Sequence, residues 1–140
     1  MAKIMMKGTE ELVLKLSRLE SGADEVAKKA IYEGAGIMAD QIRTNLEKNL
    51  SGKSTGDLIS SLGISPIKED SEGNLNAKIG FDGYDRNGTP NALKARAMES
   101  GTSKQQKKPF VRPAINQARN KAKEAMKQVI DEETKKIMGG

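Results

Sequence analysis

The chain has 140 residues, of which 36% are hydrophobic and 3% aromatic, and its 24 Lys and Arg residues outnumber its 19 Asp and Glu residues. It contains no cysteine and no histidine, which excludes disulfides and thiolate metal sites and removes the usual general base of enzymes. The length predicts a single domain, residues 1–140, with a mainly aliphatic core. The basic balance permits contact with DNA or with an acidic protein surface.

The first predicted elements are a short strand over residues 3–7 and a helix over residues 9–20. Thr9 is placed like a helix N-cap, and two glutamates follow it in the first turn, where the helix dipole favours carboxylates. Apolar residues then recur with helical spacing as far as Leu19. No stretch resembles a signal peptide and no apolar run approaches the ~20 residues of a membrane span, so we expect a soluble protein made in a reducing cytoplasm.

A long second helix is predicted over residues 24–50, because apolar residues keep the helical spacing from Val26 to Leu46. Gly34 and Gly36 lie inside this helix, where each costs about 1 kcal/mol relative to alanine. Two explanations remain open at this stage: the glycines allow another segment to approach closely, or they mark a kink.

Two strands, over residues 62–69 and 74–81, flank a run of turn formers and predict a β-hairpin. Pro66 places the first of them at a sheet edge or a bulge. A weaker strand is predicted over residues 92–100, and a last helix over residues 113–137, with Pro113 in its first turn. The fold class is therefore α+β: a small antiparallel β-sheet of three to four strands packed against two long helices, with extended loops.

No motif for catalysis or cofactor binding is complete in this sequence. Gly52-Lys53-Ser54 resembles the end of a phosphate-binding loop, but it follows a helix and lacks the first glycine of that motif. The Asp- and Asn-rich residues 82–88 lack the ligand spacing of a calcium loop. Without histidine or cysteine, a catalytic constellation would need Lys, Ser, Tyr and carboxylates alone, and the sequence shows no such constellation. We therefore predict no catalytic residues, no metal site, no cofactor and no enzymatic activity.

Basic residues gather late in the chain, at Lys94, Arg96, Lys104, Lys107, Lys108 and Arg112. Such a cluster can hold DNA phosphates, but most lysine runs are simply solvated surface. The few aromatic residues are widely spaced, which argues against stacking on single-stranded bases.

Two segments together resemble a known family. Residues 98–104 (Met-Glu-Ser-Gly-Thr-Ser-Lys) are followed by residues 108–114 (Lys-Pro-Phe-Val-Arg-Pro-Ala) and a long helix. Residues 54–62 (Ser-Thr-Gly-Asp-Leu-Ile-Ser-Ser-Leu) follow the earlier long helix. The two segments, with residues 54–62 first and residues 98–114 later in the chain, resemble the tail-completion or head-to-tail joining proteins. These proteins belong to the neck of long-tailed bacteriophages and prophages.

The resemblance implies a structural virion protein, made in the bacterial cytoplasm, that forms a ring at the head-proximal end of the tail. Its partners would be copies of itself and neighbouring tail-terminator, tail-tube or head-completion proteins, with no small-molecule substrate and no membrane. The alternative is a basic protein that contacts DNA without sequence specificity. We expect the loops 82–91 and 101–112 to become ordered when a neighbour docks, with Phe110 either an anchor on that neighbour or an ordinary core residue. The predicted subunit-interface residues are Thr55, Gly56, Leu58, Glu99, Gly101, Thr102, Lys104, Pro109, Phe110, Arg112 and Pro113.

Overall fold

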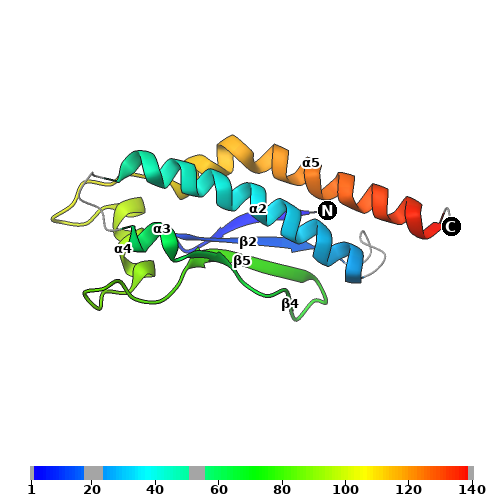
Figure 1. The fold of residues 1–140 in the computed structure, drawn as a ribbon, viewed down its shortest axis with the longest axis horizontal. Coiled ribbons are helices and arrows are strands. Elements are labelled where there is room, and N and C mark those ends of the chain that lie inside the picture. Colours follow the sequence, from blue (N-terminus) through cyan, green and yellow to red (C-terminus); the bar gives the residue numbers. More distant parts are fainter. Residues whose placement is uncertain (1, 18–23, 51–55, 139–140) are drawn as a thin grey trace.

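A computed structural model describes residues 2–17, 24–50 and 56–138 and arranges them in two layers, an antiparallel sheet and a pair of long helices (Figure 1). This confirms the predicted α+β class. The elements in chain order are β1 (Lys3–Lys7), β2 (Glu11–Leu16), α2 (Asp24–Asn49), α3 (Asp57–Ser60), β3 (Leu62–Ile64), β4 (Lys68–Glu69), β5 (Leu75–Phe81), α4 (Asn91–Ser100) and α5 (Val111–Met138).

The sheet has five strands, more than the three to four predicted, in the order β1-β2-β5-β3, and β4 also pairs with β5. All pairs are antiparallel. The predicted strand 62–69 is divided into β3 and β4 by the segment that contains Pro66, which lacks the N–H needed for a continuous ladder. Both pieces lie at the edge beside β5, so the expected edge position of Pro66 is confirmed.

The predicted helix over residues 9–20 is wrong in its described part, because Glu11–Leu16 is the strand β2. Leu12, Leu14 and Leu16 also fit a period of two, and this face is buried against the helices. β2 lies between β1 and β5, so pairing on both of its edges outweighs the local helical pattern. The chain turns from β1 into β2 at Gly8, whose φ of 71° suits glycine. Residues 18–20 lie outside the described part of the chain.

The predicted strand over residues 92–100 is also wrong, because Asn91–Ser100 forms the helix α4. Three alanines lie in this segment together with Leu, Lys, Arg, Met and Glu, all good helix formers. Its buried positions Asn91, Ala95 and Glu99 are spaced by four residues, which places them on one helical face. α4 ends at Gly101, whose φ of 78° breaks the helix.

The two long helices are close to their predicted ranges: α2 ends at Asn49, and α5 begins two residues before Pro113. Proline is tolerated there because first-turn N–H groups have no partner inside the helix. The helices pack closely at Gly34, where an added Cβ would lie 2.7 Å from Cγ of Met126. Close approach is thus confirmed for Gly34, whereas a Cβ at Gly36 would meet nothing. In the described chain, no helix combines the length and apolar character required to cross a bilayer.

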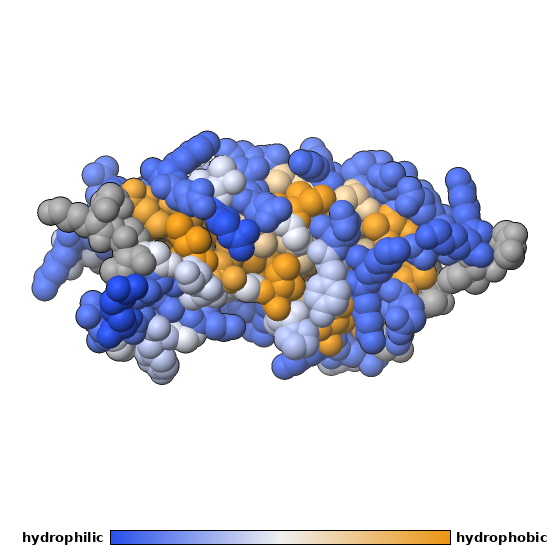
Figure 2. Space-filling model, viewed as in Figure 1, coloured by the Kyte–Doolittle hydropathy of each residue, from blue (hydrophilic) through white to orange (hydrophobic). Residues whose placement is uncertain are grey.

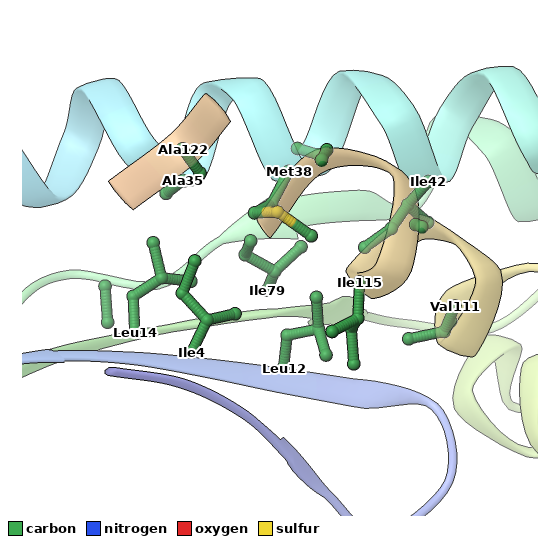
Figure 3. Close-up of a cluster of buried hydrophobic side chains, with 14 of the residues drawn as sticks. Ile4, Leu12, Leu14, Ala35, Met38, Ile42, Ile79, Val111, Ile115 and Ala122 are labelled. Atoms are coloured by element: carbon green, nitrogen blue, oxygen red, sulfur yellow. The ribbon is translucent and has the colours of Figure 1, made fainter. Parts of the chain in front are cut away.

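The core lies between the sheet and the helices (Figure 3). Ile4, Leu12, Leu14 and Ile79 point from the strands toward Met38, Ile42, Val111 and Ile115 on the helices. These side chains are aliphatic apart from one thioether, as the composition predicts. Because neighbouring strand residues point to opposite faces, the other face of the sheet turns away from both helices.

Candidate subunit interface

The segments that carry the phage-protein resemblance lie at one end of the elongated molecule (Figure 1). We call this end the loop end and define it as α3, α4, the loop 82–90 and the loop 101–110. Because α3 contacts α4, the segment with Gly56 and Leu58 lies beside the segment that starts at Glu99. The structure therefore brings together two motifs that are far apart in the sequence. Thr55 lies outside the described residues.

Glu99 joins α4 to α5 through its buried carboxylate. One oxygen, Oε1, accepts hydrogen bonds from the backbone N–H groups of Phe110 and Val111, at 2.9 and 2.8 Å, and Oε2 accepts one from Arg112 at 3.0 Å. These N–H groups lie at the start of α5, where the helix itself provides no acceptors and its dipole favours a negative charge. Glu99 is thus a side-chain cap supplied by a neighbouring helix, and its role is structural.

Gly101 and Thr102 form the turn that leads out of α4. A Cβ on Gly101 would lie 3.0 Å from the backbone nitrogen of Lys107, so both its positive φ and its close surroundings require glycine. Thr102 and Gln105 exchange two backbone hydrogen bonds, and the N–H of Lys108 donates to the carbonyl of Met98 at 2.7 Å. The loop 101–110 is therefore a folded hairpin held to its own chain.

Phe110 belongs to the core: it is 0% exposed and its ring meets that of Phe81 edge to face, with centroids 5.8 Å apart. Leu58 and Glu99 are buried as well. While the monomer keeps this fold, these side chains offer a neighbouring subunit little or no surface. The prediction that Phe110, Leu58 and Glu99 contact a neighbouring subunit directly is therefore wrong. These residues instead stabilise the fold of the loop end.

Asn45 and Asn49 on α2 also hold the loop end, and the sequence analysis did not identify them. Nδ2 of Asn45 donates to the carbonyl of Phe110 at 3.1 Å, and Nδ2 of Asn49 donates to the carbonyls of Lys108 and Pro109. The available signal was the polar residue Asn45 beside the apolar stripe of this helix, since a buried amide needs a fixed partner.

The loop 82–90 is closed by Asp85. Its Oδ1 accepts the N–H groups of Asn87 and Thr89, and its Oδ2 forms an ion pair with the ammonium group of Lys94 at 3.1 Å. The hydrogen bond from Thr89, followed by that from Lys94, lowers the pKa of Asp85. Arg86 binds both carboxylate oxygens of Asp57 at the start of α3. In this structure the loop is held by hydrogen bonds and ion pairs from its own chain, and its ordering on docking stays a prediction.

Two large side chains project outward from this scaffold. Tyr84 is 72% exposed and Leu93, on α4, is 52% exposed. Beside Leu93 lies a groove of about 480 Å³, whose lining includes Leu50, Leu58, Lys94, Ala97 and Met98. Figure 2 shows a band of apolar residues running along one face of the molecule from this end. The loop end therefore presents apolar surface next to polar, hydrogen-bonded backbone.

The other predicted interface residues remain accessible. Thr102, Lys104, Pro109 and Arg112 are exposed, and Pro113 is partly exposed. They occupy the outer side of the α4–α5 connection, so a docking molecule could reach them.

The basic cluster predicted from the sequence is divided by the fold. Lys94 pairs with Asp85, and Arg96 pairs with Glu10 at 3.2 Å. The four remaining basic side chains are exposed on the α4–α5 connection and the start of α5: Lys104, Lys107, Lys108 and Arg112. Two of the six predicted basic residues are thus paired with acidic partners within the chain.

Among the described residues, no group of three or more acidic side chains is arranged to hold a metal ion. No protein-family model, no curated protein and no solved structure matches this chain.

Proposed function

We propose that this protein is a structural subunit of a bacteriophage neck, which forms a ring at the head-proximal end of the tail and joins the tail to the head. The support is the resemblance of residues 54–62 and 98–114, together with the position of both segments at the loop end. In this proposal the motif residues shape a docking surface, and no catalytic group or cofactor takes part.

The observation that carries the proposal is that Tyr84 and Leu93 are exposed on a loop end whose backbone is held by hydrogen bonds within the chain. The carboxylates of Asp85 and Glu99 accept backbone hydrogen bonds that fix the chain on both sides, so docking would order few additional residues. Burying one large apolar side chain contributes roughly 1.5–3 kcal/mol, and apolar side chains on a prearranged scaffold are typical anchors of protein interfaces.

A ring requires two different surfaces on each subunit, because a head-to-tail contact joins unlike patches. In our proposal the loop end is one of these surfaces. The exposed Lys104 and Arg112 would surround the apolar anchors as a polar rim, which is the usual arrangement of such interfaces. The neighbouring partners would be tail-terminator, tail-tube or head-completion proteins.

Size-exclusion chromatography with light scattering, over a series of protein concentrations, tests self-assembly. We expect the wild-type chain to form a closed oligomer as concentration rises and the double variant Tyr84→Ser, Leu93→Ser to remain monomeric. Tyr32→Ser is the matched control, because Tyr32 is 47% exposed but lies on α2. Equal assembly of the double variant and the control would contradict the role of the loop end, provided that both unfold at the wild-type urea concentration.

Location in the virion tests the neck assignment itself. Antibody labelling of particles from a phage that encodes this chain should place the protein at the head–tail junction in electron micrographs. Labelling at the distal tail tip, or none on intact particles, would contradict the assignment.

A further inference from the structure

The face of the sheet that turns away from the helices carries all the lysines of the described strands. The strand registers define this open face, because cross-strand partners point to the same side. Lys3 pairs with Lys15, Lys15 with Asn76, and Asn76 with Lys68, which makes one row across four strands. Met5, Val13 and Lys78 form the next row, and Lys7 lies opposite Glu11 in a third.

Positive charge on the open face is poorly compensated. Among the described strand residues, the acidic residue on this face is Glu11, against the lysines Lys3, Lys7, Lys15, Lys68 and Lys78. Outside the strands, Asp70 pairs with Lys15 at 3.3 Å. Lys3 and Lys15 are direct cross-strand partners, an arrangement of like charges that destabilises a sheet.

Lys7 and Lys78 also repel each other across β2. The approach of the Lys78 side chain to Lys7, and then its charge, lowers the pKa of Lys7, although Glu11 acts in the opposite direction. A bound anion would relieve this repulsion.

The type of side chain on this face indicates the kind of partner. Lysine is depleted in the centres of protein interfaces, where arginine and aromatic residues are enriched. None of the residues on the open face of the described strands is arginine or aromatic. This face therefore has no guanidinium group for bidentate binding of carboxylates and no aromatic ring on which unpaired bases could stack. The flexible ammonium groups of lysine suit the phosphates of a duplex, because binding to phosphates depends on positive charge more than on a fixed orientation of the donor.

We infer that the open sheet face, with Lys3, Lys7, Lys15, Lys68 and Lys78, binds the backbone of double-stranded DNA without sequence specificity. At one end of this face Gly63 and Gly80 are cross-strand partners, and the side chain of Glu11 lies close to Gly80. Contacts from lysine to phosphate oxygens fix position but carry no sequence information, so the inferred binding is non-specific. The inference concerns a single chain and does not depend on ring formation.

The dimensions of the patch agree with this partner. Lys3 and Lys7 are four residues apart on β1, which corresponds to roughly 13 Å, and the row from Lys3 to Lys68 crosses three strand spacings, roughly 14 Å. Over 13 Å of axis a duplex presents about eight phosphates. A duplex therefore carries enough phosphates over this length for several of the lysines to make contact at the same time, and Lys15 would exchange its partner Asp70 for a phosphate.

Fluorescence anisotropy with a labelled 20-base-pair duplex, over a salt series, tests the inference. If all the lysines of the face contact phosphates, the wild-type affinity should fall about 500-fold between 50 and 200 mM salt. The triple variant Lys3→Gln, Lys7→Gln, Lys78→Gln should lose only about 12-fold over the same range, because two contacts remain. It should also bind more weakly than wild type at 50 mM.

The matched control is Lys28→Gln, Lys48→Gln, Lys121→Gln, which removes the same charge from exposed positions on the helical layer. It should keep the wild-type salt dependence. Equal weakening by both triple variants, or no binding of duplex by wild type at 50 mM, would overturn the inference. So would equally tight binding of poly-glutamate or of the single strand, which would indicate an acidic protein or unpaired bases as the partner. Circular dichroism and urea midpoints of both variants establish that they remain folded.

Discussion

Replacing Glu99 by glutamine tests whether its carboxylate holds α5 in place. In wild type the carboxylate accepts three backbone hydrogen bonds, at 2.9, 2.8 and 3.0 Å. The Glu99→Gln side chain has the same shape but a single acceptor oxygen, so its amide group would face at least one N–H donor. A hydrogen bond to a charged group contributes roughly 1.5–3 kcal/mol, and a charge at a partly buried helix terminus up to about 2 kcal/mol.

We therefore expect Glu99→Gln to lower the free energy of unfolding by about 3 kcal/mol, within a range of about 2–5 kcal/mol. With an m-value of about 2 kcal/mol/M, the urea midpoint measured by circular dichroism should fall by about 1.5 M. Glu47→Gln is the control, because Glu47 is exposed on α2 and its replacement should cost less than about 0.5 kcal/mol. A Glu99→Gln midpoint equal to that of the control would refute the capping argument.

Other predictions concern the core, the helix contact and acid stability. Phe110→Ala should lower the free energy of unfolding by about 3–5 kcal/mol in urea melts, and a loss below about 1 kcal/mol would show that Phe110 is not a core residue. Gly36→Ala should stabilise the protein by about 0.5–1 kcal/mol because its Cβ meets open space, whereas Gly34→Ala should destabilise it because Met126 must move; equal effects of the two substitutions would contradict the close approach. The pKa of Asp85 is lowered in the folded state, first by the N–H of a loop residue, so its contribution is present above the ordinary aspartate pKa of about 4 and is lost as pH falls through the folded value. Between about pH 4 and 2 the stability of wild type should therefore decline more steeply than that of Asp85→Asn, and parallel urea-midpoint curves would count against the structure of that loop.

Elements with strong local patterns were predicted well. The two long helices were found because each keeps an apolar stripe over many turns, and the hairpin before residue 82 was found because turn formers separate two apolar runs. The short elements Glu11–Leu16 and Asn91–Ser100 were predicted wrongly. Glu11–Leu16 satisfies both helical and strand spacing over six residues, and only its pairing with β1 and β5 decides between them. For Asn91–Ser100 the helix propensity of alanine was the available signal, and the strand prediction disregarded it.

The candidate interface was located more accurately than its individual residues were assigned. The motif segments do lie together, but Glu99 and Phe110 point inward. The carboxylate of Glu99 accepts N–H groups that have no partner inside α5. The ring of Phe110 is stabilised by burial against other apolar side chains. The lysines of the open face were not recognised, since β2 was predicted as a helix and the registers that align them were therefore unknown.

By itself, the amino-acid order determined the α+β class, the two long helices and the absence of cysteine and histidine chemistry. These depend on composition and on periodicities within one segment, which no tertiary contact needs to supply. Tertiary structure alone decided which side chains of the loop end face solvent and which lysines share one face of the sheet. Both depend on contacts between residues distant in the chain, such as Lys15 beside Asn76 or Glu99 at the start of α5, and a local pattern contains no information about such partners.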